Sequence, residues 1–250
     1  MLALGLIGFV CVGLALGMLG GGGSILAVPV LVNVLAIPAG TAVPMALPVV
    51  GIAAAAGAIA RWRQGQLRLD TFALFAVCAT AASYIAARLG VGIADRPRIL
   101  MFGAVMLLAA IAMWRRGSQS TPAVPHAPRP VYQVIPVAIL VGTLTGILGV
   151  GGGFLIVPAL VGVLALPMPE ATATSLAVIA LNAASAGAGF VSKHVAIDLR
   201  ITVLVTLAAL VGMAIGLRLA PRYSAASLAR AFAVLLVVLA VFTIGRELGT

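Results

Sequence analysis

The sequence predicts an all-α integral membrane protein with about eight transmembrane helices. They would form two tandem four-helix repeats, the first helix of each repeat broken at a glycine-rich motif. Three observations predict this fold class. The 250-residue chain is 63% hydrophobic and only 8% charged, whereas a soluble domain carries about 25% charged residues. Its apolar runs are continuous, which argues against the alternating pattern of a transmembrane barrel. Residues 13–47 recur at 142–176, with 17 of the 35 positions identical.

Eight apolar segments are the predicted membrane regions, and Ala, Leu and Gly dominate them, as in closely packed membrane helices. The first segment follows no basic stretch and precedes no cleavage site, so we expect a retained span and not a secretory signal. The segments are 2–37, 39–60, 70–90 and 98–115 in the first half, and 133–166, 169–191, 199–219 and 227–245 in the second.

A polar, proline-rich stretch from Gly117 to Pro130 divides the two halves. Its composition is typical of an extended surface linker. We therefore expect a first transmembrane repeat at 1–117, a linker at 118–131 and a second transmembrane repeat at 132–250. The repeat continues beyond the glycine motif, since its offset of 129 becomes 130 after one inserted residue near 194.

The first segment of each half is too long for one plain span, because 36 residues of helix would measure about 54 Å against a hydrocarbon core of about 30 Å. The glycines are the expected break. Pro29 and Pro158 are expected to add a second break, because proline removes a backbone donor. One broken crossing gives four spans in each half and parallel repeats, whereas a hairpin gives five and inverted repeats. We favour the first, because residues 24–37 are short for a crossing.

The two glycine motifs are the candidate substrate site. A glycine run before a helix start leaves N–H groups without partners, where the helix dipole adds positive charge and can hold an anion. A glycine-broken apolar segment in matching places of two halves also points to a transporter's binding site. The alternative is that the glycines only permit tight helix crossing. The substrate-binding candidates here are Gly20, Gly21, Gly22, Gly23, Ser24, Gly149, Gly151, Gly152 and Gly153.

Segment 169–191 adds candidate side chains. Thr174 and Ser175 stand eight and seven residues before Asn182, so they share a helix face with it, and all three are expected to bind substrate. The first half has Met, Ala and Ala at the equivalent positions, which makes the predicted site asymmetric. The alternative is that the hydroxyls bond to the preceding turn and that the amide bridges helices. Arg88 and Arg218 occupy matching positions near span ends and are candidates for attracting an anion, with snorkelling to the headgroups as the alternative.

Other function classes find no support in the sequence. The net charge of +10 does not indicate nucleic acid, because the basic residues lie between apolar segments, where they set membrane topology. No nucleotide-binding loop, metal-ligand spacing or nucleophile–base set is present. We therefore expect no cofactor, no metal site and no catalytic residue, and we do not expect an enzyme.

Several motifs taken together resemble one known family. They are the repeated Gly-x-Gly-Gly-Gly-x-x-x-Val-Pro pattern, the Ala-Thr-Ala-Thr-Ser-Leu run at 171–176, the Gly-Leu-Arg-Leu run at 216–219 and the two-fold plan. This combination resembles the sulfite exporter TauE/SafE family of membrane permeases over essentially the full length. The first half departs from the pattern, with Met45 and Ala46 where Thr-Ser would be expected.

The resemblance implies a multi-pass protein of the cell inner membrane that transports small sulfur-containing anions such as sulfite or organosulfonates. We expect a secondary transporter, an exporter or permease, that holds the anion at the glycine-rich helix breaks between the two repeats. A passive anion channel and a non-transporting membrane scaffold are the alternatives. The expected partners are a small anionic substrate and the lipid bilayer, and a homo-oligomer is left open.

Overall fold

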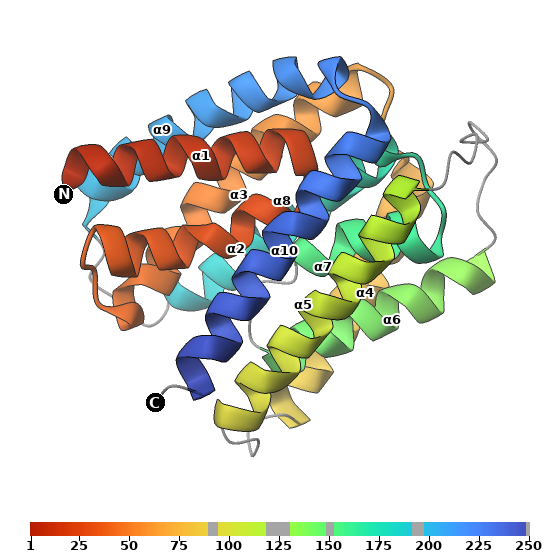
Figure 1. Ribbon diagram of the computed structural model, residues 1–250, viewed down its shortest axis with the longest axis horizontal. Coiled ribbons are helices and arrows are strands. Elements are labelled where there is room, and N and C mark those ends of the chain that lie inside the picture. Colours follow the sequence, from red (N-terminus) through yellow and green to blue (C-terminus); the bar gives the residue numbers. More distant parts are fainter. Residues whose placement is uncertain (90–94, 119–130, 149–152, 192–197, 249–250) are drawn as a thin grey trace. The chain divides into compact units, whose positions relative to one another are not determined.

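The computed structural model describes residues 1–89, 95–118, 131–148, 153–191 and 198–248, and these residues form helices without any strand (Figure 1). The first half contains α1 (Leu2–Leu19), α2 (Gly22–Pro29), the π-helix η1 (Val30–Val34), α3 (Ala39–Arg63), α4 (Leu69–Leu89) and α5 (Asp95–Ser118). The second half contains α6 (Val131–Leu148), α7 (Gly153–Pro158), the π-helix η3 (Ala159–Val163), α8 (Met168–Val191), α9 (Leu199–Leu219), the 3-10 helix η4 (Ala220–Arg222) and α10 (Ala225–Leu248). The predicted all-helical fold class is confirmed.

The helix bounds of the two halves follow the sequence repeat. The helices α1, η1 and α3 begin 129 positions before α6, η3 and α8, and α4 and α5 begin 130 positions before α9 and α10. Within the described residues, five helices are long and apolar enough to cross a membrane. These five are Leu2–Leu19, Gly40–Arg63, Leu69–Ala86, Leu199–Arg222 and Ala225–Gly245.

The chain reverses direction at Gly20, so that α2 and η1 pack back along α1. Gly8 lies against the side chain of Val30, and Gly5 lies against Leu35. Residue numbers rise along one helix as they fall along the other, so α1 and the segment α2–η1 form an antiparallel hairpin. The predicted single broken crossing at 2–37 is therefore not confirmed. The small glycine side of α1 lets the second arm of the hairpin approach closely.

Two pairs of corresponding helices, each pair packed within one unit, run in opposite directions. In one such pair, Gly57 of α3 lies against Leu176 of α8, and Gly51 lies against Ala183, so α3 and α8 are antiparallel. The pair α5 and α10 is also antiparallel (Figure 1). Repeats of four crossings would be parallel to one another, whereas a hairpin adds one reversal to each half. The four-plus-four layout is thus not confirmed, and opposite directions within the pairs α3–α8 and α5–α10 are what inverted repeats would give.

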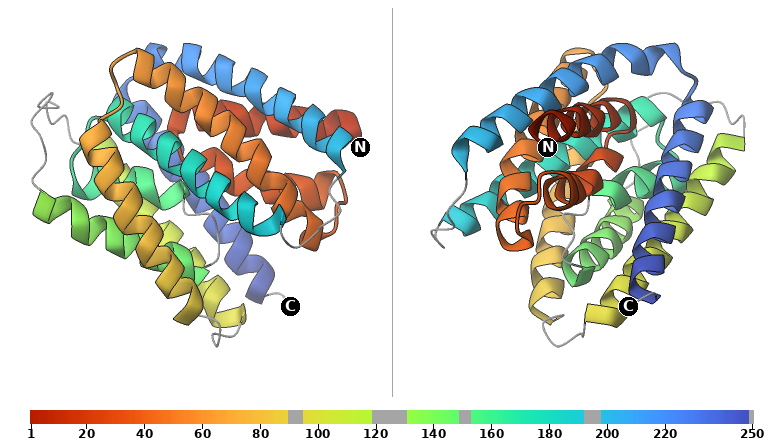
Figure 2. Two further views of the ribbon diagram at one scale, coloured as in Figure 1. Left: turned by 180° about the vertical axis from the view of Figure 1, so that it is seen from behind. Right: turned by 60° about the vertical axis from the view of Figure 1, so that its left-hand side comes forward.

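Two compact units make up the structure, and each unit takes helices from both halves of the sequence. The first unit comprises Met1–Arg68 and Thr172–Arg222, and the second comprises Leu69–Ala171 and Tyr223–Thr250. In the first unit α1 packs along α9 (Figure 2), and in the second unit α6 packs along α4 and α10 along α5. The first helix of each repeat is therefore partnered by a helix of the other repeat.

Glycine contacts join these exchanged helix pairs. Gly13 of α1 meets the backbone of Ala209 on α9, and its counterpart Gly142 of α6 meets the backbone of Ala79 on α4. The same contact, between equivalent residues, therefore occurs once in each unit. Small residues at such interfaces let two backbones approach until a Cβ atom has no room. Further glycines at the α1–α9 contact are Gly17, Gly212 and Gly216.

Candidate functional site

Gly20 makes the turn between α1 and α2. Its φ of 81° and ψ of −78° lie in a region that glycine reaches more readily than any other residue. A Cβ atom at this position would stand 3.0 Å from the Cα atom of Thr172 on α8. Backbone conformation and close packing therefore both require glycine at position 20.

The start of α2 exposes backbone donors at the same turn. Gly22 and Gly23 are buried, and within the described residues no carbonyl accepts a hydrogen bond from either amide. The Ser24 hydroxyl, which is half-buried, donates to the Gly21 carbonyl over 2.7 Å. Gly23 also lies against the Val12 carbonyl. This glycine therefore permits close helix packing, which was the alternative to a role in binding substrate. The turn combines tight packing with N–H groups at a helix start that donate to no carbonyl of the described residues.

The polar residues of α8 occupy different environments. Thr174 and Ser175 are fully buried and Asn182 is half-buried. In the described part of the chain the Thr174 hydroxyl has no hydrogen-bond partner, which is uncommon for a buried hydroxyl. The α8 residue that contacts Gly20 is Thr172, which we did not select from the sequence.

The second glycine motif is described only in part. Gly149, Gly151 and Gly152 lie outside the described residues. Gly153 begins α7 and is buried, as is the rest of this helix. The neighbouring Phe154 ring packs edge-on against Phe102 of α5, with ring centroids 5.3 Å apart.

Pro29 and Pro158 end α2 and α7, and a five-residue π-helix follows each of them. The Leu35 amide donates to the Val30 carbonyl over 3.2 Å, and the Leu164 amide donates to the Ala159 carbonyl over the same distance. Each π-helix leads into an alanine with positive φ, 54° at Ala36 and 51° at Ala165. The two repeats therefore share this change from α to π geometry, which follows the loss of a donor at proline.

The arginines are distributed differently from our expectation. Arg218 is exposed in the last turn of α9, and the side chain of Arg88 on α4 lies outside the described part. The arginine that the structure buries is Arg61 on α3, which is 5% exposed. Sequence reasoning missed it because it stands in an ordinary Arg-Trp-Arg span end. Its counterpart at an offset of 129 is Phe190, and this lack of symmetry is the signal that would have marked it.

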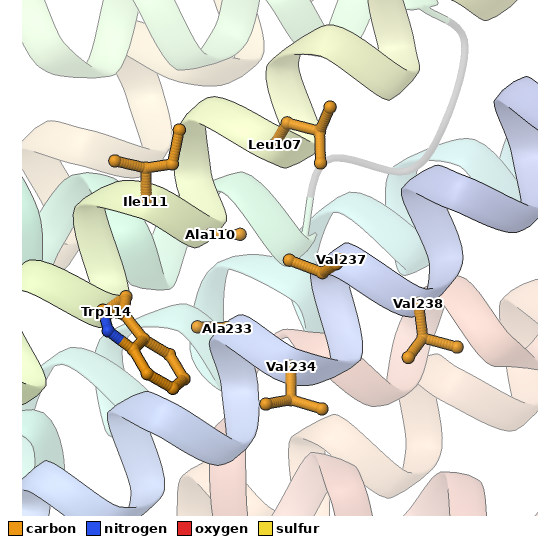
Figure 3. Close-up of a pocket in the computed structure, with 8 residues that line it drawn as sticks. All are labelled: Leu107, Ala110, Ile111, Trp114, Ala233, Val234, Val237 and Val238. Carbon is orange, nitrogen blue, oxygen red and sulfur yellow. The ribbon is translucent and has the colours of Figure 1, made fainter.

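One surface pocket lies between α5 and α10, and none of the predicted site residues lines it. Figure 3 shows Trp114 beside Ala233 at this pocket. The lining residues are Leu107, Ala110, Ile111, Trp114, Ala233, Val234, Val237 and Val238. This lining is almost entirely apolar, so it offers nothing to bind an anion. Among the described residues, no group of three or more His, Cys, Asp or Glu could hold a metal ion.

Comparison with known proteins identifies the family. The family model described as "Sulfite exporter TauE/SafE" matches residues 4–243. The chain belongs to the sulfite exporter TauE/SafE family. Two curated relatives, from Xylella fastidiosa strains 9a5c and Temecula1, are each named "Probable membrane transporter protein". They are 31% identical over 245 and 242 residues, which cover 94% of this chain and 92% of each relative. No solved structure matches the chain.

Membership confirms the resemblance drawn from the sequence motifs. As a TauE/SafE family membrane transporter, the protein is a multi-pass protein of the lipid bilayer, and its cargo is a small molecule. The family is a transporter family and not an enzyme class.

Proposed function

We propose that this protein is a secondary transporter, an exporter or permease, of small sulfur-containing anions such as sulfite or organosulfonates in the cell inner membrane. The family match over residues 4–243 carries the proposal. The sequence contains no nucleotide-binding loop, which favours transport driven by a gradient over transport driven directly by ATP.

The opposite directions within the pairs α3–α8 and α5–α10 support a transporter of this kind. Inverted repeats and helices broken in matching places are recurrent features of secondary transporters, whose substrates bind at the breaks. Here the break at Gly20 lies between α1 and α2, and the antiparallel hairpin returns the chain toward the start of α1. A break of this kind at membrane depth is tolerated where protein buries it or a water-filled cavity faces it.

The turn of the first unit is the proposed anion contact. The amides of Gly22 and Gly23 stand at the start of α2, where the helix dipole is positive. Buried surroundings strengthen this attraction because they screen it less than water does. By the repeat, Gly149, Gly151, Gly152 and Gly153 would supply the matching contact, with Thr174, Ser175 and Asn182 as side-chain partners.

Two other functions remain as outcomes of the test. A passive channel would pass anions without saturation and without coupling to a second ion. A membrane scaffold would use its glycines for packing alone, and anions would leave its stability unchanged.

The test is thermal unfolding of the purified protein in detergent with sulfite, sulfate, thiosulfate, taurine, sulfoacetate, phosphate and chloride. A ligand that binds only the folded state adds about 2.7 kcal/mol at a concentration of 100 Kd. We expect selective stabilisation by a sulfur oxyanion or a sulfonate, followed by saturable flux of that anion in proteoliposomes. An equal response to every anion, or none, would overturn the substrate assignment, and non-saturating flux would indicate a channel.

A further inference from the structure

Arg61 is buried although it stands near the end of an apolar helix. It is 5% exposed, whereas the adjacent Trp62 is 55% exposed and Arg63 is also exposed. An arginine at the end of a membrane helix ordinarily extends toward the headgroups. Arg61 is directed instead into the first unit, against the end of α1, so membrane anchoring does not account for it.

Two hydrogen bonds hold the Arg61 guanidinium. Its Nη2 atom donates to the Gly17 carbonyl over 2.8 Å, in a buried bond, and its Nη1 atom donates to Gln66 Oε1 over 2.8 Å, in a partly buried bond. The Nε atom is buried without an acceptor among the described residues. Since a guanidinium has five N–H donors, it retains unused capacity to bind an acceptor.

The Gly17 carbonyl is available because the chain turns away from α1. The Gly21 amide, which would donate to the Gly17 carbonyl in a continuing helix, donates to the Leu19 carbonyl instead. Carbonyls left open in this way at a helix end carry partial negative charge. Arg61 is therefore tied to the last turn of α1, three residues from the Gly20 turn.

Both acceptors of Arg61 are neutral, so the charge of the guanidinium is compensated only in part. Neither bond joins it to a carboxylate. A buried charge without a counter-ion is costly, and an ionisable residue inside a membrane protein is by default a functional one. An anion is the kind of partner that would complete this compensation.

We propose that Arg61 is the cation that binds the transported oxyanion, and that Gln66 occupies its place until the anion arrives. The inference rests on the proposed function and deepens it. The carboxamide oxygen of Gln66 gives the guanidinium a neutral acceptor where an anionic oxygen would form a stronger bond. The anion displaces the partly buried Gln66 bond, while the buried Gly17 bond keeps Arg61 in position.

The first experiment compares Arg61→Gln with Arg63→Gln, a matched control that removes the same charge from an exposed position on the same helix. Sulfite binding to the purified full-length protein is titrated by thermal stabilisation in detergent. We expect Arg61→Gln to weaken binding about thirtyfold or more, as for loss of one partner of a buried charged pair. Arg63→Gln should stay close to wild type.

The possible results separate the Arg61 assignment from the proposed transport function. If wild type binds sulfite and Arg61→Gln binds it equally well, the Arg61 assignment is wrong and the proposed function stands. If wild type responds to no sulfur oxyanion, both are wrong.

A second pair of variants covers the case in which Arg61→Gln does not fold. Gln66→Glu supplies a permanent carboxylate, so it should fold, melt at a higher temperature than wild type and lose its response to sulfite. Gln66→Ala removes the competitor and should bind sulfite more tightly than wild type. A folded Gln66→Glu protein with wild-type sulfite affinity would contradict the proposal.

Discussion

At Ala36 and at Ala165 the chain adopts nearly the same positive φ, 54° and 51°, after two π-helices that begin 129 positions apart. The polar side chains of the two repeats differ where the backbone agrees. Phe190 stands at the position equivalent to Arg61, and Met45 at the position equivalent to Thr174. The duplication preserves what the helices need in order to pack. It does not preserve the polar side chains at these two positions.

The largest expected effect tests the backbone features that the repeats share. Gly13→Val and Gly142→Val each push a branched side chain into a facing backbone, at Ala209 and at Ala79. Since a backbone cannot move aside as a flexible side chain can, each variant should lose more than about 3 kcal/mol of stability or fail to fold. The yield and melting temperature in detergent measure this loss.

The control for these valine variants is Gly40→Ala, because no atom lies within 4 Å of a Cβ at that exposed position. This variant should change stability little. Folding of Gly13→Val with wild-type stability would show that the exchanged helix pair α1–α9 is not what holds the first unit together.

The next effect separates the two reasons for glycine at the first turn. Gly20→Ala should cost about 2–4 kcal/mol, because it combines a positive φ with crowding against Thr172. Gly65 has a φ of 72° and nothing within 4 Å of a Cβ, so Gly65→Ala tests a positive φ without crowding and should cost about 1–2 kcal/mol. Gly20→Ala should cost more than Gly65→Ala, because the strained γ-turn geometry at Gly20, with its ψ of −78°, and the contact with α8 both add to it. Equal losses of unfolding free energy would mean that neither addition contributes.

A smaller effect, a gain in stability, is expected at Thr174, a polar residue that the first repeat does not share. Thr174→Val removes a buried hydroxyl without a partner in the described structure, so it should stabilise the protein by about 1–2 kcal/mol. Thr206 is the matched control, because its hydroxyl donates to the Thr202 carbonyl over 2.6 Å. Thr206→Val should give no such gain. If Thr174 binds substrate, the more stable variant will respond less to the anion, whereas an unchanged response would limit Thr174 to a packing role.

The smallest expected effect compares the repeats directly. Ala36→Gly and Ala165→Gly relieve the same positive φ, which more than offsets the greater freedom of glycine in the unfolded chain. Each should raise the unfolding free energy by about 0.5 kcal/mol. Guanidinium titrations in detergent measure these changes in unfolding free energy. A gain for one variant and a loss for the other would show that the two alanines have different surroundings despite their shared φ.

Sequence reasoning identified the helical segments closely because they are long and uniformly apolar. The predicted segment 199–219 coincides with α9, and the predicted 169–191 differs from α8 by one residue at its start. At 2–37 the sequence left the hairpin as the less favoured alternative, because apolar residues on both arms gave no periodic signal of a reversal. The reversal is seen only in the structure, where Gly5 contacts Leu35 and Gly8 contacts Val30. The burial of Arg61 was hidden for a similar reason, since its main acceptor, Gly17, lies 44 positions earlier.

The sequence by itself determined the membrane class, the two-fold repeat and the family, because composition and repeated motifs depend only on the order of residues. Only the tertiary structure decided the direction of the helices, the exchange of α1 and α6 between the repeats, and the burial of one arginine among its neighbours. These features depend on close contact between backbones that are distant in the chain. An apolar sequence allows many such contacts, and the positions of a few glycines select among them.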